Sequence, residues 1–278
     1  TALTVDSGSG TQTIYAGFSG VWTYSRPALE SSDFTTERVL GELSQPTAID
    51  WSRDGRMFIA HQDGRVLVHA DGKLTTFVDL SAEVNNNWNR GLLGVEIHPD
   101  FPTTPYVYVL YTYDPPGLSG PDGAADGRDG NGSRVSRLVR LTADGDQGYN
   151  VAETGSETVI LGKNSTLATI GDPADAGGEN WNNPACVTDV GTPVTDCLPS
   201  EGPSHSIGWL EFGHDGSLFV SNGEGAPYLS PDPRAARAFP GDQDHRALRR
   251  VLLRLVEAVL ALGLDGPRCG DDESRTDE

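Results

Sequence analysis

The sequence of 278 residues has few cations, since 20 Lys and Arg stand against 40 Asp and Glu and the formal net charge is −20. Such a chain repels nucleic-acid phosphates and anionic lipid headgroups, so a general nucleic-acid binder is excluded to first order. No run of 18 apolar residues occurs, and we expect no membrane span. The sequence also lacks Gly-x-Ser-x-Gly, His-Glu-x-x-His and phosphate-loop motifs, so the enzyme classes that those motifs mark receive no support.

Cysteine is scarce, with three residues in the chain. Cys186 and Cys197 flank a turn-rich segment without a nearby pair of His, which is a poor pattern for zinc. We expect them to form a disulfide, with two free thiols as the alternative. A disulfide favours an extracytoplasmic location, periplasmic or secreted. The sequence starts at Thr1 rather than Met, which fits a fragment or a processed form that has lost a signal peptide.

Asp-Gly turns dominate the segment that follows Gln45. Asp54-Gly55, Asp63-Gly64 and Asp71-Gly72 separate short apolar runs within about 20 residues. Asp-Gly between such runs is a strong hairpin signal, because Gly tolerates a positive φ. The pattern therefore predicts an antiparallel meander.

The same unit recurs, because residues 210–221 match residues 49–60 position for position and residues 93–111 form a looser copy. Repeated meanders joined by long inserts are typical of propeller blades, so we expect an all-β fold, with an ordinary β-sandwich as the alternative. The inserts cover 114–133 and 172–203, and such inserts often carry functional sites.

Composition divides the chain into three parts. Residues 1–20 are rich in Gly, Ser and Thr and are expected to be a leader or linker, and residues 21–230 hold the propeller portion. Residues 231–278 form a divergent tail, with apolar residues at helical spacing over 248–260. The tail is expected to carry a C-terminal amphipathic helix, and its break in composition suggests a truncated or frame-shifted reading of a longer gene.

Three segments carry a resemblance to a known family. They are Gly91-Leu92-Leu93-Gly94 running into His98-Pro99-Asp100-Phe101, then Arg134-Val135-Ser136-Arg137-Leu138, and then Ser204-His205-Ser206-Ile207-Gly208 running into Phe212-Gly213 and Asp215-Gly216. In this order they resemble the soluble PQQ-dependent glucose/sorbosone dehydrogenase family over about residues 45–225. The resemblance implies part of a six-bladed β-propeller, about three blades. It also implies oxidation of a sugar or small-alcohol hydroxyl by hydride transfer to PQQ, with calcium as a second cofactor.

By that resemblance His205 is the catalytic base, since a neutral imidazole with a pKa near 6.5 can accept the hydroxyl proton. Ser204 stands where active glucose dehydrogenases have an acidic residue that can orient the imidazole, and as a weaker partner it is grouped with the candidate cofactor-binding residues. Asn89 and Arg90 lie where the family places a polar contact to cofactor or substrate. The alternatives are a structural role for His205 and a loop-cation role for Arg90.

Other groups of residues give weaker evidence of function. The acidic loop with Asp122, Asp126 and Asp129 is interpreted as a solvated loop rather than a calcium site, so no metal ligand is assigned. The cofactor-clamping Lys and Arg residues of the family belong to later blades that have no match here. Trp88 and Trp209 are expected to be blade-packing or rim aromatics, with core packing favoured over a place beside a sugar.

Two functions remain open from the sequence. One is a quinone-dependent sugar or alcohol dehydrogenase domain that is incomplete in this chain. The other is a non-catalytic propeller that binds carbohydrate or protein. In either case unpartnered blades have open edges, so we expect self-association.

Overall fold

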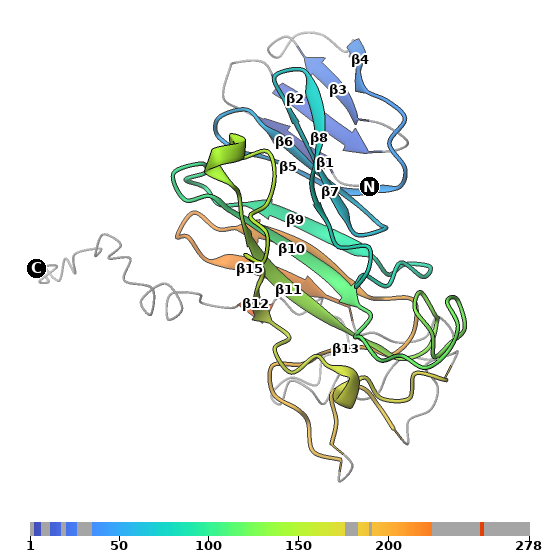
Figure 1. The fold of residues 1–278 in the computed structure, drawn as a ribbon. Coiled ribbons are helices and arrows are strands. Elements are labelled where there is room, and N and C mark those ends of the chain that lie inside the picture. Colours follow the sequence, from blue (N-terminus) through green and yellow to red (C-terminus); the bar gives the residue numbers. More distant parts are fainter. Residues whose placement is uncertain are drawn as a thin grey trace, which may run out of the picture.

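The computed structural model describes residues 3–6, 12–17, 21–26, 35–175, 183–188, 191–223 and 251–252. These residues form an all-β fold of four antiparallel sheets, which follow one another along the chain (Figure 1). The described part also contains two single-turn 3-10 helices, η1 (Gly145–Gln147) and η2 (Leu167–Thr169). None of the described helices is long and apolar enough to cross a membrane.

The first sheet contains β1 (Leu3–Asp6), β2 (Gln12–Gly17), β3 (Val21–Arg26) and β4 (Thr35–Leu40), in that spatial order. Two of these strands lie within residues 1–20, where we expected a leader or linker. The expected boundary after residue 20 therefore falls between two paired strands, because β2 and β3 share a ladder from Gln12–Arg26 to Gly17–Val21.

The second sheet is the meander that the Asp-Gly turns predict. It contains β5 (Pro46–Trp51), β6 (Met57–His61), β7 (Arg65–Ala70) and β8 (Lys73–Asp79). Asp71 and Gly72 both have positive φ, at 51° and 72°, and connect paired Ala70 and Lys73. Two central residues with positive φ suit the right-handed twist of the flanking strands, so the hairpin prediction is confirmed here.

The third and fourth sheets contain the remaining strands. The third has β9 (Leu92–Ile97), β10 (Tyr106–Tyr113), β11 (Arg134–Thr142) and β12 (Thr158–Leu161), with β13 (Leu198–Ser200) paired to β11. The fourth has β14 (Ile207–Phe212), β15 (Leu218–Asn222) and β16 (Val251–Leu252). The three repeats seen in the sequence therefore coincide with the strand pairs β5–β6, β9–β10 and β14–β15.

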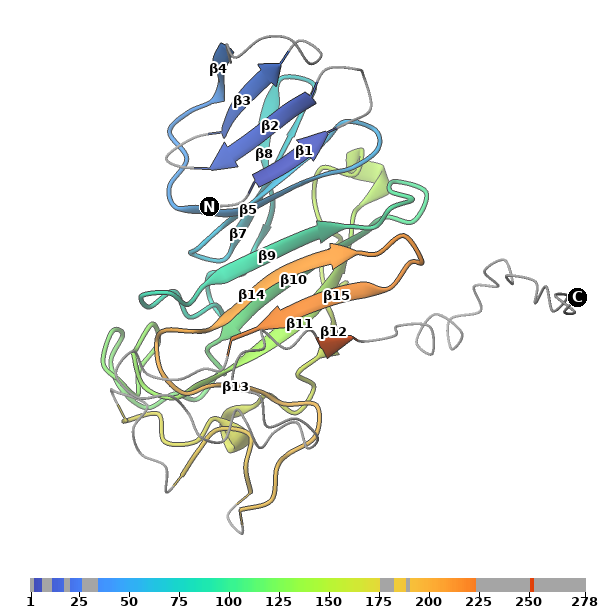
Figure 2. The same ribbon diagram turned by 180° about the vertical axis from the view of Figure 1, so that it is seen from behind.

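The second, third and fourth sheets pack face to face with their first strands side by side, β5 next to β9 and β9 next to β14 (Figure 2). Strand β10 is buried on both faces. Val107 and Val109 join one core with Phe58 of β6, whereas Leu110 joins a second core with Leu210 of β14. Successive meanders stacked on their first strands are blades of a propeller rather than the two layers of a sandwich, which confirms the propeller prediction.

The predicted C-terminal helix is wrong for the two tail residues that the structure describes. Val251 and Leu252 form β16 and pair with Val220 and Phe219 of β15. The physical reason is that the free edge of β15 offers backbone hydrogen bonds, which tertiary pairing supplies in preference to a weak local helix propensity. The rest of the predicted helix lies outside the described residues.

Candidate active site

A loop between the second and third sheets, residues 85–91, carries the predicted contacts Asn89 and Arg90. It ends at Gly91, whose φ is 141° and where a Cβ would lie 2.6 Å from the carbonyl oxygen of Gln62. Only glycine fits this close approach. The Gln62 amide donates to the carbonyl oxygens of Trp88 and Arg90, at 2.6 and 2.8 Å. The loop is thus held against the second blade.

Arg90 is 0% exposed, and its guanidinium is fully used inside the protein. Its five N–H groups donate to five acceptors, which are Ser200 Oγ and the carbonyl oxygens of Gly130, Gly132, Ser200 and Glu201. Burial and the charge of Arg134 lower the pKa of Arg90 to about 9, so the group stays charged at neutral pH. This geometry matches the loop-cation alternative, with Arg90 as a positioning residue.

A second buried cation, Arg134, organises the first insert. It is 0% exposed, and its Nε donates a short hydrogen bond to the carboxylate of Asp114, which is also buried. The same carboxylate accepts from the Asn85 side chain at 3.0 Å and from the Asp129 N–H at 2.7 Å. The remaining donors of Arg134 reach the carbonyl oxygens of Ser133, Ala125 and Gly127. Sequence reasoning missed this network, whose only sign was one acid and one Arg at neighbouring strand ends.

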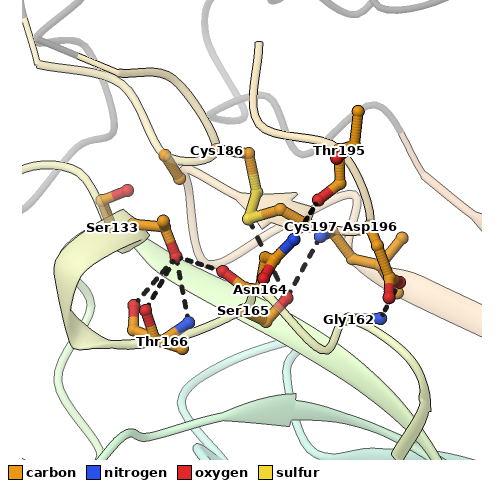
Figure 3. Close-up of a disulfide and its surroundings, with 12 residues drawn as sticks. Ser133, Gly162, Asn164, Ser165, Thr166, Cys186, Thr195, Asp196 and Cys197 are labelled. Atoms are coloured by element: carbon orange, nitrogen blue, oxygen red, sulfur yellow. Dashed lines mark hydrogen bonds between the residues drawn. A yellow bond between two sulfur atoms is a disulfide. The ribbon is translucent and has the colours of Figure 1, made fainter.

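Glu201 connects the second insert to the same network. Its carboxylate accepts from Ser133 Oγ at 2.9 Å and from the Ala185 N–H at 2.8 Å. Ala185 precedes Cys186, whose disulfide with Cys197 is present, as predicted (Figure 3). The disulfide, Glu201 and Arg90 are therefore linked through hydrogen bonds in the segment that leads to residues 203–205.

The disulfide loop itself rests on the segment after β12. The Asp196 carboxylate accepts a hydrogen bond from the Gly162 N–H at 2.7 Å. The backbone carbonyl oxygen of Asp196 accepts a second one from the Asn164 N–H at 2.9 Å. The Asn164 side chain donates to the carbonyl oxygen of Thr195 at 2.7 Å, as Figure 3 shows. Covalent and hydrogen-bonded restraints thus act on the same short stretch.

His205 is exposed and has a positive φ of 52°. Its backbone is fixed from below, because the Gly223 N–H donates to the Ser206 carbonyl oxygen and a Cβ on Gly223 would lie 2.1 Å from the His205 carbonyl oxygen. Ser204, in contrast, is 2% exposed. The imidazole therefore lies at the surface on a rigid backbone, while the serine beside it is buried.

The structure brings the two predicted segments together. The N–H of Asn89, whose side chain is exposed, donates to the carbonyl oxygen of Pro203 at 3.1 Å. This hydrogen bond connects residues 85–91 to residues 203–205 across more than a hundred residues of sequence. Asn89 and His205 thus lie on two segments that a backbone hydrogen bond joins, and both side chains are exposed.

Of the positions expected for the two tryptophans, core packing is wrong. Trp88 is 72% exposed and Trp209 is 54% exposed, so neither packs inside a blade, and their exposure agrees with the rim alternative. Trp88 belongs to the loop 85–91, where its φ is 53° and its carbonyl oxygen accepts from the Gln62 amide. Trp209 lies on β14, where the next residue, Leu210, joins the core and Trp209 is exposed.

The described residues fit the implied cofactors only in part. PQQ carries three carboxylates and needs a set of cations, yet both cations of the buried support, Arg90 and Arg134, have their donors engaged by protein acceptors. For calcium, the described part of the chain contains no group of three or more Asp, Glu, His or Cys residues that could hold a metal ion. Beside these engaged cations, the two joined segments present the exposed amide of Asn89 and the exposed imidazole of His205.

Meander blades stacked on their first strands, with a histidine-bearing loop joined to an asparagine-bearing loop, define a β-propeller chain with one candidate surface site. The family model for glucose/sorbosone dehydrogenase matches residues 43–185, which is just over half of the chain. The chain therefore belongs to the glucose/sorbosone dehydrogenase family.

Known relatives include quinoprotein glucose dehydrogenase B of Acinetobacter calcoaceticus, which is 31% identical over 91 residues, covering 31% of this chain and 19% of the relative. Among solved structures, a glucose dehydrogenase-type oxidoreductase from Thermus thermophilus is 26% identical with a TM-score of 0.39, covering 66% of this chain and 38% of that one. The PQQ-bound aldose sugar dehydrogenase of Streptomyces coelicolor is 18% identical with a TM-score of 0.38, covering 66% and 39%. The chain thus spans well under half the length of these relatives.

Proposed function

We propose that this chain is the part of a PQQ-dependent sugar dehydrogenase that supplies the catalytic base and one polar edge of the active site. The observation that carries the proposal is the hydrogen bond between the Asn89 N–H and the Pro203 carbonyl oxygen. It joins the two segments that match the family motifs most specifically. The likeness to quinoprotein glucose dehydrogenase B supports the same assignment.

In this proposal His205 accepts the proton of a sugar hydroxyl. An exposed imidazole on a fixed backbone is accessible to substrate, and an imidazole nitrogen can accept a hydroxyl proton. Asn89 offers an exposed amide that can donate to and accept from polar groups of cofactor or substrate. Ser204, the residue before His205, is buried.

PQQ is the proposed hydride acceptor, and calcium its companion cofactor. When bound, PQQ supplies the redox chemistry that no protein side chain provides. Its anionic groups require cations other than Arg90 and Arg134, and the net charge of −20 opposes its binding. We therefore propose weak cofactor binding and no measurable glucose oxidation by this chain alone.

An extracytoplasmic location, periplasmic or secreted, is part of the proposal. It is supported by the Cys186–Cys197 disulfide, because such bonds persist in oxidising compartments.

Calorimetric titration of the purified chain with PQQ in the presence of calcium tests the proposal. We expect saturable binding that Asn89→Ala weakens. Asn86→Ala is the matched control, since Asn86 is an exposed residue of the same loop whose backbone N–H keeps its bond to Asp129. Absence of any PQQ binding, or equal binding by the Asn89→Ala variant, contradicts the proposal.

The second candidate function is a non-catalytic propeller that binds carbohydrate or protein. The engagement of every Arg90 donor within the protein favours it, because this cation beside the Gly91-Leu92-Leu93-Gly94 motif is unavailable to a carboxylate ligand. This alternative predicts no PQQ binding, so the same titration separates the two functions.

A further inference from the structure

Trp88 combines two costly features in one residue. Its side chain is 72% exposed and its φ is 53°, in the left-handed region that bulky residues rarely adopt. Strained backbone and exposed aromatic surface persist where the surrounding structure imposes them, and such outliers gather at binding sites. The residue therefore calls for a functional explanation.

The backbone around Trp88 is held firmly in place. The Gln62 amide donates to the Trp88 carbonyl oxygen at 2.6 Å, and the Asn87 side chain donates to the Asp129 carbonyl oxygen at 3.0 Å. Arg90, two residues further on, is anchored by its five hydrogen bonds. The exposed indole is consequently mounted on a rigid support, which lowers the entropy cost of binding a ligand to it.

Trp88 lies on the loop that is hydrogen-bonded to the segment of the candidate base. Asn89, the following residue, donates through its N–H to Pro203, and His205 lies two residues after Pro203. His205 is also exposed with a positive φ. Two strained and exposed ring-bearing residues thus flank a single hydrogen bond between their loops.

We infer that Trp88 is a specificity-determining residue that stacks on the ring of a pyranose sugar and presents its hydroxyls toward His205. This inference rests on the proposed function and narrows its substrate class. A gluco-configured pyranose has apolar faces of axial C–H groups, which suit the flat indole, and hydroxyls around its edge. A small acyclic alcohol has no such face, so the site selects a pyranose over it.

The test is a titration of the purified chain with D-glucose in the absence of PQQ, followed by calorimetry and by tryptophan fluorescence. We expect saturable glucose binding that Trp88→Ala weakens by about tenfold and Trp88→Phe weakens less, because a smaller ring still stacks. Trp209→Ala, which removes another exposed tryptophan, keeps the affinity of the parent chain. Ethanol in place of glucose gives no saturable signal.

Unchanged glucose affinity in Trp88→Ala overturns the inference, and so does a parent chain that binds no glucose. Circular dichroism and the thermal transition establish that each variant is folded, and the Trp88→Phe variant gives an independent reading at the same position. Because PQQ is omitted, the outcome is separate from the cofactor titration. If glucose binding depends on Trp88 but the chain binds no PQQ, the dehydrogenase proposal is contradicted and the stacking inference is supported.

Discussion

The Glu96 carboxylate of β9 accepts a hydrogen bond of 2.9 Å from the Phe212 N–H of β14, across the boundary between two blades. The same kind of hydrogen bond crosses the boundary between the second and third blades, where Asp50 of β5 accepts from the Ile97 N–H of β9 at 2.7 Å. Each acid is the fifth residue of the first strand of its blade, and each donor is the sixth residue of the next first strand. Glu211 holds the same fifth position in β14. A half-buried carboxylate thus connects the second blade to the third and the third to the fourth.

These carboxylates make stability depend on pH. Burial, followed by the charge of Asp50, raises the pKa of Glu96 to about 9, and burial raises the pKa of Asp50 to about 6. The ordinary pKa is 4.5 for Glu96 and 3.8 for Asp50. At a pH between the ordinary and the raised pKa of each group, the folded state binds more protons than the unfolded state. Their contribution to stability is therefore largest at low pH within this window and is lost as the pH rises toward about 9.

We predict that Glu96→Gln flattens this dependence. The amide oxygen of Gln still accepts from Phe212, but the group no longer has to ionise. The free energy of unfolding from urea titrations should rise relative to the parent chain near pH 9, with little difference near pH 5. Glu153→Gln, at an exposed position, is the control. An unchanged slope in Glu96→Gln contradicts the assignment.

The fold was accessible from the sequence because its signals are local. The Asp-Gly turns fix hairpins through backbone geometry, and the match of residues 49–60 with 210–221 reflects equal blades. The surroundings of Arg90 and Trp88 were harder to predict. A sequence does not show which carbonyl oxygens surround a guanidinium or whether a loop leaves an indole exposed to solvent. In the tail, Val251 and Leu252 follow a helical pattern, yet an edge strand far away in sequence pairs with them. Non-local partners decided each of these cases.

Removal of the disulfide should destabilise the chain. Cys186 and Cys197 close a loop with a sequence separation of 11, and closing a loop of this size is worth roughly 2–3 kcal/mol in the chain-entropy model. We expect the Cys186→Ser/Cys197→Ser double variant to lose stability by about this amount. Intact-mass measurement with and without reductant establishes the bond first. Two freely alkylated thiols in the unreduced protein would remove this prediction.

Arg134 should matter more to folding than its less buried counterparts. Replacing it with Met leaves the Asp114 carboxylate buried without its ion-pair partner, at a cost of about 3–5 kcal/mol. Arg140→Met, on the same strand, is the control, because Arg140 is half-buried and packs over the Tyr106 ring at 4.2 Å. Urea unfolding of both variants makes the comparison. Equal losses would show that the Arg134–Asp114 pair has no special role.

The chain should associate in solution. Trp209 and Glu211 lie on exposed positions of β14, and a blade buries its face only against a neighbouring blade. We expect sedimentation velocity to show a weight-average mass that increases with concentration, and Trp209→Ser to reduce it. A monomer at all concentrations with a sharp thermal transition at high temperature argues against this.

The most direct test of the account is a dye-linked assay of glucose oxidation with added PQQ and calcium, on the parent chain and on His205→Ala. The account holds that the chain carries the base and a polar edge of the site, while Arg90 is committed to internal hydrogen bonds and cannot clamp the cofactor. It predicts no glucose oxidation above background by either protein. Turnover by the parent chain that disappears in His205→Ala would contradict it, and would show that the chain itself contains a working cofactor clamp.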